Sequence, residues 1–305
     1  MTADVLITGA NGQLGWELQR RATASSRTAR AFTRTDLNIT DADSVARTIE
    51  AASPKVVVNT AAYTAVDKAE TEPAAAFAVN RDGPANLATT CAELNIPLIH
   101  ISTDYVFDGT KPDAYSEEDA VAPLGVYGES KLAGENAIRA SDAEHVILRT
   151  AWVYGVHGHN FVKTMLRLGE KQDALRIVGD QHGCPSFAGD LADTILKISD
   201  RMRSGDVPAN GHGTFHCTGE GSTTWCDFAR TIFELAGPTT GRVPTVDGIT
   251  TAEYPTPARR PANSVLDCGK LTRTYGITLR PWQEALAEML QFTLSEDTGA
   301  AKEMR

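Results

Sequence analysis

Residues 5–15 read Val-Leu-Ile-Thr-Gly-Ala-Asn-Gly-Gln-Leu-Gly, an apolar run that passes directly into three glycines spaced three apart. Val5–Thr8 predicts a buried strand, and Gln13–Ala22 has apolar residues recurring on one helical face. A strand, a glycine turn and a helix form the context in which backbone amides and a helix N-terminus bind a pyrophosphate. The stretch therefore predicts a dinucleotide-binding unit.

Strand-like and helical segments continue to alternate through the first half of the chain. The expected strands are 29–33, 55–59, 97–102 and 145–149, and the expected helices are 43–52, 73–94 and 130–140. This alternation is typical of an α/β fold with a doubly wound parallel (Rossmann) sheet. After about residue 156 the alternation becomes irregular. We expect a dinucleotide-binding Rossmann domain over 1–155. Residues 156–305 are expected to form mainly a smaller substrate-binding lobe, with segments returning to the sheet and a frayed end at 296–305.

The composition is that of a soluble globular protein. Of the 305 residues, 42% are hydrophobic and 22% are charged, and no apolar run approaches the roughly 18 residues that cross a bilayer. The five cysteines are scattered and the N-terminus has no basic leader, so we expect a cytoplasmic enzyme with free thiols. A formal charge of −10 disfavours binding to nucleic acid.

The end of the second expected strand indicates which dinucleotide is bound. An acidic residue there binds the adenosine ribose, whereas a guanidinium binds a 2′-phosphate in bidentate fashion. The segment Thr33–Asp36 contains Arg34, so we expect NADPH, with NADH still open. The alternative for Arg34 is an ordinary solvated side chain.

Tyr127 and Lys131 stand four residues apart, on one face of an expected helix. A free tyrosine has a pKa of about 10, and a nearby ammonium lowers it. We expect Tyr127 to be a general acid that protonates a carbonyl oxygen as a hydride reaches the carbon. Lys131 could also reach the nicotinamide ribose. Thr103, at a strand end, is expected to donate to the same oxygen, and a strand-end cap is its alternative.

These motifs resemble those of the extended short-chain dehydrogenase/reductases. The segments that carry the resemblance are Gly9–Gly15, Asn59–Asp67, Ser102–Gly109 and Tyr127–Lys131. The segments Thr150–Gly155, Asn160–Leu166 and Tyr254–Pro261 are similar to those of one family within them, the dTDP-4-dehydrorhamnose reductases. That resemblance implies NADPH-dependent reduction of the 4-keto group of dTDP-6-deoxy-L-lyxo-4-hexulose, the last step of dTDP-L-rhamnose supply for cell-envelope polysaccharide.

The resemblance also implies the site residues. Catalysis is assigned to Thr103, Tyr127 and Lys131. Cofactor binding is assigned to Gly9, Asn11, Gly12, Gln13, Leu14, Gly15, Arg34, Asp36, Leu37, Ala61, Ala62, Tyr63, Thr64, Tyr127 and Lys131. Substrate binding is assigned to Thr103, Asp104, Trp152, Asn160, Gln181, Arg259 and Arg260. Trp152 could equally be a core residue, and Arg259-Arg260 a solvated pair.

No metal site is expected from the histidines. His157/His159 and His212/His216 have ligand-like spacing but no cysteine or carboxylate partners at fixed offsets. Some relatives are described as binding magnesium through glutamates at a subunit contact. The corresponding segment, Met289–Phe292, has no acidic residue, so magnesium and the choice between monomer and homodimer stay open.

Two other functions stay open. Dehydratases of the same superfamily have Asp-Glu after the active-site threonine, whereas Tyr105 occupies the second position here, which favours a reductase. An epimerase or reductase of another nucleoside-diphosphate keto-sugar would use the same fold. A non-catalytic dinucleotide-sensing subunit is the other alternative, although it need not retain Thr103, Tyr127 and Lys131 together.

Overall fold

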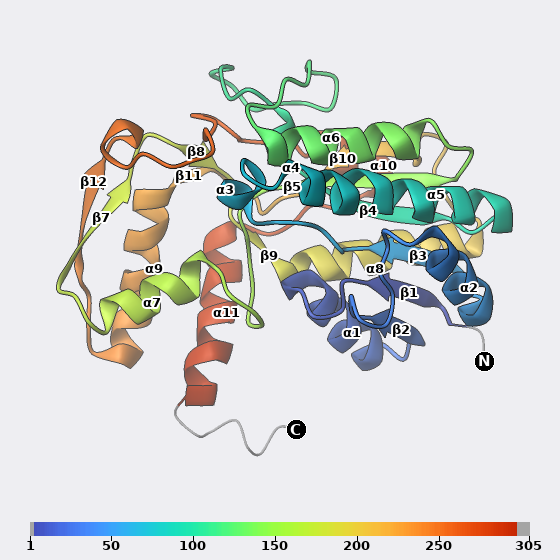
Figure 1. Cartoon of the computed structure of the whole chain (residues 1–305). Helices are drawn as coiled ribbons and strands as arrows, with labels where there is room; N and C mark the ends of the chain where they lie inside the picture. Colours follow the sequence, from blue (N-terminus) through green and yellow to red (C-terminus); the bar gives the residue numbers. More distant parts are fainter. Residues whose placement is uncertain (1–2, 298–305) are drawn as a thin grey trace.

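The computed structural model describes residues 3–297, and a six-stranded parallel sheet runs through it (Figure 1). The strand order is β10-β5-β4-β3-β1-β2. The strands are β1 Val5–Thr8, β2 Ala29–Phe32, β3 Val56–Asn59, β4 Leu98–Thr103, β5 His145–Thr150 and β10 Gly213–His216. The predicted α/β fold is confirmed. The chain reverses its direction across the sheet between β1 and β3, where ligands bind at the carboxyl ends of the strands.

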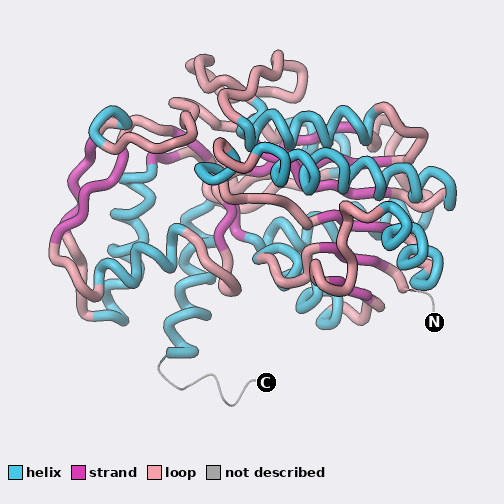
Figure 2. Tube along the Cα trace, viewed as in Figure 1, coloured by secondary structure: helices cyan, strands magenta, loops and turns pink. Residues whose placement is uncertain are grey.

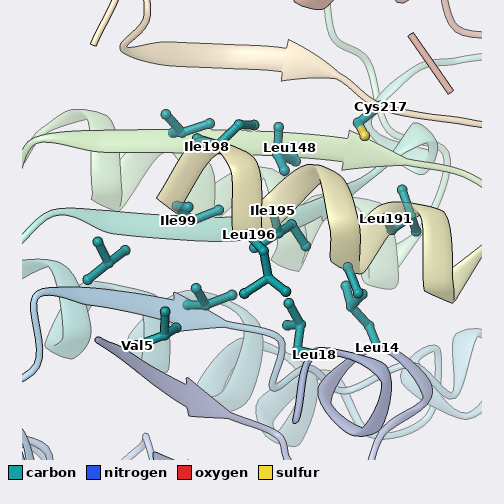
Figure 3. Packing of buried hydrophobic residues seen from close by; sticks show 14 of the residues in the cluster. Val5, Leu14, Leu18, Ile99, Leu148, Leu191, Ile195, Leu196, Ile198 and Cys217 are labelled. Carbon is teal, nitrogen blue, oxygen red and sulfur yellow. The ribbon is translucent and has the colours of Figure 1, made fainter. Parts of the chain in front are cut away.

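Helices cover both faces of this sheet. On one face lie α1 (Gln13–Ala24) and α8 (Ala188–Ser204), and on the other lie α2 (Ala42–Ala52), α5 (Gly83–Leu94) and α6 (Val126–Arg139). Figure 3 shows Ile195 and Ile198 of α8 lying near Ile99 and Leu148 of the sheet. A segment far along the chain therefore completes the first apolar core.

The predicted helix over 73–94 is wrong as a single helix. The structure has α4 (Pro73–Phe77), a wider π-helical turn η1 (Ala78–Asp82) and α5. Pro84 has no backbone N–H and its ring excludes the carbonyl four residues earlier, so regular bonding cannot pass this point. The wide turn places the Asn80 side chain against Tyr63, whose backbone N–H and C=O it binds at 2.8 and 3.0 Å.

The helix expected over 130–140 begins four residues earlier. In α6, Gly125 is the N-cap residue in extended conformation, and the Val126 N–H donates to Glu70 Oε1 at 2.9 Å. A side chain from a distant segment thus satisfies a free amide of the first turn. Because of this earlier start, Tyr127 and Lys131 belong to one regular helix.

Many of the remaining elements form a second cluster beside the sheet (Figure 2). Its helices are α7 (Phe161–Gly169), α9 (Trp225–Thr240) and α11 (Trp282–Asp297). Its short strands pair as β6 (Val153–Tyr154) with β9 (Ser186–Phe187), β7 (Ala174–Val178) with β12 (Thr245–Ile249), and β8 (His182–Gly183) with β11 (Thr223–Thr224). The short helices are α3 (Val66–Ala69), α10 (Gly269–Tyr275), η2 (Asp104–Val106) and η3 (Thr251–Glu253).

Within residues 3–297 the structure contains no helix with the length and apolarity needed to span a bilayer. The expected fraying of the C-terminus concerns residues that lie almost entirely outside this range. The assignment of 1–155 and 156–305 to cofactor and substrate stays a prediction.

Candidate active site

A cavity of about 570 Å³ opens at the carboxyl ends of β1, β3 and β4. Its walls include every residue predicted to bind the cofactor except Asp36. Residues that line it without having been predicted are Asn38, Ile39, Thr60, Val79, Ile101, Thr150, Val153, Gly158 and His159. A larger surface hollow of about 750 Å³, around Lys270 and Arg273, contains none of the predicted site residues.

The glycine loop at the base of this cavity fits a pyrophosphate. At Gly15 a Cβ atom would lie 2.3 Å from the Gly9 carbonyl oxygen, so only glycine lets the first turn of α1 pack on the loop. The Gln19 side chain donates to the Ala10 carbonyl at 2.9 Å and holds the loop from behind. The N-terminal amides of α1 therefore face the cavity, as anion binding requires.

After the end of β2, Arg34 lines the cavity but Asp36 does not. The Asp36 carboxylate accepts hydrogen bonds from the Thr33 backbone N–H at 3.0 Å and the Thr33 hydroxyl at 2.6 Å. These bonds lower the pKa of Asp36 and close the turn after β2. In this arrangement the Asp36 side chain shapes the turn that presents Arg34, and the predicted cofactor contact of Asp36 stays a prediction.

Tyr127 and Lys131 line the same cavity as the glycine loop. Burial raises the pKa of Tyr127 to about 12, with the Asp104 charge in the same direction and a hydrogen bond with Thr103 opposing. The expectation that Lys131 lowers this pKa is wrong. Lys131 is 2% exposed and its Nζ donates to the Ile101 carbonyl at 2.6 Å, so burial of the phenol dominates.

Thr103, at the end of β4, lies beside this pair. Its hydroxyl donates to Asp104 Oδ1 at 2.9 Å and accepts from the Tyr105 N–H at 3.2 Å. Burial raises the pKa of Asp104 to about 6, against opposing hydrogen bonds from Ser264 and Thr103. The Tyr105 ring meets the Tyr127 ring edge-on, with centroids 5.5 Å apart. Three consecutive side chains thus act on the Tyr127 phenol.

Trp152 occupies a strained backbone position just after β5. Its φ is +47°, a left-handed conformation that costs a non-glycine residue about 1–3 kcal/mol. Its ring stacks on Trp225 with centroids 3.5 Å apart and 9° between the planes. The half-buried ring is therefore held by the second cluster, not by its own backbone preference.

Arg260 is ion-paired. Its Nη2 lies 2.9 Å from Asp67 Oδ2, and the other Asp67 oxygen accepts from the Ala258 N–H at 3.1 Å. Burial raises the pKa of Tyr105, and the charges of Arg260 and Asp67 also act on it, so this pair lies close to Tyr105. Arg259 is exposed. The pair ties the 254–261 loop to α3, beside the cofactor cavity.

Asn160 and Gln181 make protein contacts. Asn160 caps α7 by accepting from the Lys163 N–H at 3.0 Å, and it donates to Gly155 O at 2.7 Å and Gln13 Oε1 at 2.9 Å. Gln181 donates to Thr251 Oγ1 at 3.0 Å. In this arrangement Asn160 positions a residue of the glycine loop. The predicted substrate contacts of Asn160 and Gln181 stay predictions.

The two histidines of each ligand-like pair have different surroundings. His157 stacks on Trp16 and its Nε2 lies 3.2 Å from the Asn11 carbonyl, whereas His159 lines the cofactor cavity. His212 is exposed and His216 is buried. Among the residues that the structure describes, no three His, Cys, Asp or Glu side chains are grouped to hold a metal ion.

Three of the nine cavity residues that the sequence did not predict come from two segments. Val79 comes from the π-helical turn, which only the interruption at Gly83-Pro84 could have indicated. Gly158 and His159 come from the second cluster, in the loop before the Asn160 cap. A glycine flanked by histidines just before a helix was the available signal, but nothing in the sequence places that loop over α1.

Comparison with known proteins gives a consistent result. A family model described as RmlD substrate binding domain matches residues 3–294. A dTDP-4-dehydrorhamnose reductase of Sinorhizobium fredii is 47% identical over 294 residues, covering 96% of this chain and 99% of that protein. Two solved reductase structures superpose with TM-scores of 0.88. One, from Clostridium acetobutylicum, is 42% identical and covers 94% of this chain and 98% of its own. Another, from Bacillus anthracis in complex with NADP, is 35% identical, and the match covers 96% of this chain and 100% of that one.

Proposed function

The chain belongs to the RmlD substrate-binding family, that of the dTDP-4-dehydrorhamnose reductases, and from this membership we propose its reaction. It reduces the 4-keto group of dTDP-6-deoxy-L-lyxo-4-hexulose with NADPH and so forms dTDP-L-rhamnose. The observation that supports this most strongly is that Tyr127 and Lys131 line the same cavity as the glycine loop and Arg34. A proton donor and a dinucleotide site in one cavity are what carbonyl reduction needs.

NADPH, when bound, supplies a hydride to the carbonyl carbon. The chain's own residues handle the oxygen. Because its pKa is raised to about 12, Tyr127 is protonated at neutral pH and can donate its proton to the developing alkoxide. Thr103 donates to the same oxygen once its hydroxyl turns from Asp104. Lys131, fixed by the Ile101 carbonyl, would hold the nicotinamide ribose of the bound cofactor.

The side chains next to Thr103 favour reduction over water elimination. Elimination requires a carboxylate base beside the acid, and position 105 is a tyrosine. The Tyr105 ring packs on Tyr127, and its phenol pKa is raised by burial, so it cannot replace that base.

For the substrate we propose contacts with Thr103, Asp104, Trp152, Asn160, Gln181, Arg259 and Arg260. Trp152 supplies an apolar face for the deoxysugar. A nucleoside diphosphate needs cations on an acidic protein, and Arg259 and Arg260 are offered by a proline-flanked loop. Arg260 contributes while still paired with Asp67, and Arg259 is exposed. We also propose that residues 156–305 mainly serve the substrate.

The function is tested by NADPH absorbance decay with the enzymatically generated L-keto-sugar, with dTDP-4-keto-6-deoxy-D-glucose as the control. Stoichiometric NADPH loss with the L-sugar alone supports the proposal. Turnover of the D-sugar would retain the chemistry but change the substrate. An epimerase would return the hydride and leave the NADPH concentration unchanged. Tight NADPH binding without turnover of either sugar would favour a sensing subunit.

Replacing Arg34 should change cofactor preference. In Arg34→Ala we expect the KM for NADPH to rise about tenfold or more, because a charge-assisted bond to the 2′-phosphate is lost. The KM for NADH should change much less. Arg30→Ala is a matched control, since Arg30 is exposed on β2 and is not among the residues of the cavity. An unchanged NADPH/NADH ratio in Arg34→Ala would refute the 2′-phosphate assignment.

A methyl group at Gly183 should displace Trp152. A Cβ there would lie 2.3 Å from the Trp152 ring, which cannot retreat through the stacked Trp225 ring. We expect Gly183→Ala to raise the KM for the sugar about tenfold, with the Kd of NADPH unchanged, and to alter near-ultraviolet circular dichroism. Gly248→Ala is the control, because its nearest neighbour would be Cys226 Sγ at 3.5 Å. Wild-type kinetics in Gly183→Ala would mean that Trp152 does not contact the sugar.

A further inference from the structure

A chain of buried polar side chains runs beneath the cofactor cavity and ends at Lys131. It begins at Thr8 on β1, whose hydroxyl lies 2.6 Å from Asn59 Oδ1 on β3. The Asn59 amide nitrogen lies 2.9 Å from His100 Nδ1 on β4, and His100 Nε2 lies 3.4 Å from Lys131 Nζ. Each side chain is at most 2% exposed. The proposed catalysis assigns no role to Thr8, Asn59 or His100.

The contacts of Asn59 fix which atom donates in each hydrogen bond between Thr8, Asn59 and His100. The Ala61 backbone N–H and the Thr8 hydroxyl both donate to Asn59 Oδ1, at 3.1 and 2.6 Å, which fixes this atom as the oxygen. The Asn59 NH₂ group therefore faces His100 Nδ1, which must accept. Burial, with the charges of Lys131 and His145, lowers the pKa of His100 well below its usual value. A neutral imidazole that accepts at Nδ1 carries its hydrogen on Nε2.

The Nε2–H group then points at Lys131 Nζ, which also donates to the Ile101 carbonyl. An ammonium has three hydrogens and no lone pair, so its Nζ cannot accept a hydrogen bond from His100 Nε2–H. A neutral amine has a lone pair and can accept the Nε2–H. Burial lowers the pKa of Lys131 to about 8, in the same direction.

We propose that His100 is a positioning residue for Lys131: held as the Nε2–H tautomer by Asn59, it favours the neutral amine over the ammonium. Thr8 and the Ala61 amide act through Asn59 by orienting its side chain. The inference rests on the proposed function in assigning Lys131 to catalysis, but the tautomer and the proton affinity can be measured without the sugar substrate.

Besides His100 on β4, ionisable groups lie on α6 itself and on β5 and η2, which pack against α6. They are Tyr127 and Glu135 on α6, His145 and Arg149 on β5, and Asp104 and Tyr105 on η2. Glu135 raises the pKa of Lys131 and so opposes His100, but its carboxylate is also bound by Arg149 at 2.7 and 2.9 Å. Tyr127 stays protonated well above neutral pH. His100 is thus the group that presents a donor to Nζ.

The tautomer is tested by ¹⁵N NMR of histidine-labelled protein. We expect the His100 signals of an unprotonated Nδ1 and a protonated Nε2, unchanged through neutral pH. Their assignment follows from their loss in His100→Gln or, should that variant not fold, from their shift in Asn59→Asp, whose carboxylate would invert the tautomer. A protonated Nδ1 or an imidazolium in the wild type would overturn the proposal.

The proton affinity of Lys131 is tested by the pH dependence of NADPH binding, which is measured through the cofactor fluorescence. In His100→Gln the glutamine oxygen can accept from the ammonium, so the transition that Lys131→Met removes should move up by about one pH unit. His216→Gln, a buried histidine on β10, is the matched control and should leave it unmoved. No shift in a folded His100→Gln would overturn the proposal. A shift without turnover of either keto-sugar would support His100 and count only against the proposed substrate.

Discussion

Tyr127→Phe should lose nearly all reductase activity while it still binds NADPH. Removing a proton donor that acts in the transition state costs about 10²–10⁴-fold in kcat, and no other side chain is placed to replace it. Thr103 is engaged with Asp104, and the Tyr105 ring meets Tyr127 edge-on. Phenylalanine retains that ring contact, so the cavity and its cofactor affinity should persist. Stopped-flow reduction and fluorescence titration of NADPH measure the two quantities separately.

Tyr115→Phe is the matched control. Tyr115 is buried, its hydroxyl donates to Asp108 at 2.7 Å, and it does not line the cofactor cavity. The Tyr115→Phe protein should be less stable than the wild type but have the same kcat. If Tyr127→Phe bound cofactor normally and turned over at the wild-type rate, Tyr127 could not be the acid.

Glu135→Ala should give the largest loss of stability among the charged residues. Glu135 is fully buried between α6 and the sheet, where it accepts from Arg149 Nε and Nη2 at 2.9 and 2.7 Å and from the Ser102 hydroxyl at 2.5 Å. Its loss leaves the buried Arg149 guanidinium without a counter-charge from Glu135. Breaking such a pair costs about 3–5 kcal/mol, to be measured by urea unfolding.

Two variants distinguish this burial effect from charge alone. Arg176→Ala removes the exposed pair with Glu253 and should cost less than about 1 kcal/mol. The double variant Glu135→Leu/Arg149→Met removes both buried charges and should recover part of the loss. Equal stability of Glu135→Ala and the wild type would show that the ion pair does not contribute to folding.

Local patterns predicted the first half of the fold because its strands are short apolar runs with glycine and proline at their ends. The helix break at η1 was missed because it depends on Pro84 within an otherwise helical composition. The outer strand β10 was not identified as part of the sheet: Gly213–His216 lies among glycines and pairs with β5 only through tertiary contact. Neither feature has a period that a sequence window can detect.

The candidate site likewise has features that local sequence predicts and features that depend on tertiary packing. Glycine spacing and the Tyr127–Lys131 interval place side chains by local geometry, so the cavity wall was largely predictable. The pKa of Tyr127 was predicted in the wrong direction because burial is a property of the packed molecule. The Arg260–Asp67 pair joins residues 193 positions apart, and the His100 chain crosses three strands. Such contacts depend on strand order, which no single segment encodes.

The late return of α8 and β10 to the sheet has a consequence for biosynthesis. When residues 1–155 have left the ribosome, β5 is still an unpaired edge and the apolar surface later covered by α8 is open to solvent. An exposed edge and an uncovered core favour aggregation. The nascent chain therefore cannot complete its six-stranded sheet before about residue 216 has emerged. A fragment ending near residue 155 is expected to need a chaperone instead of folding by itself.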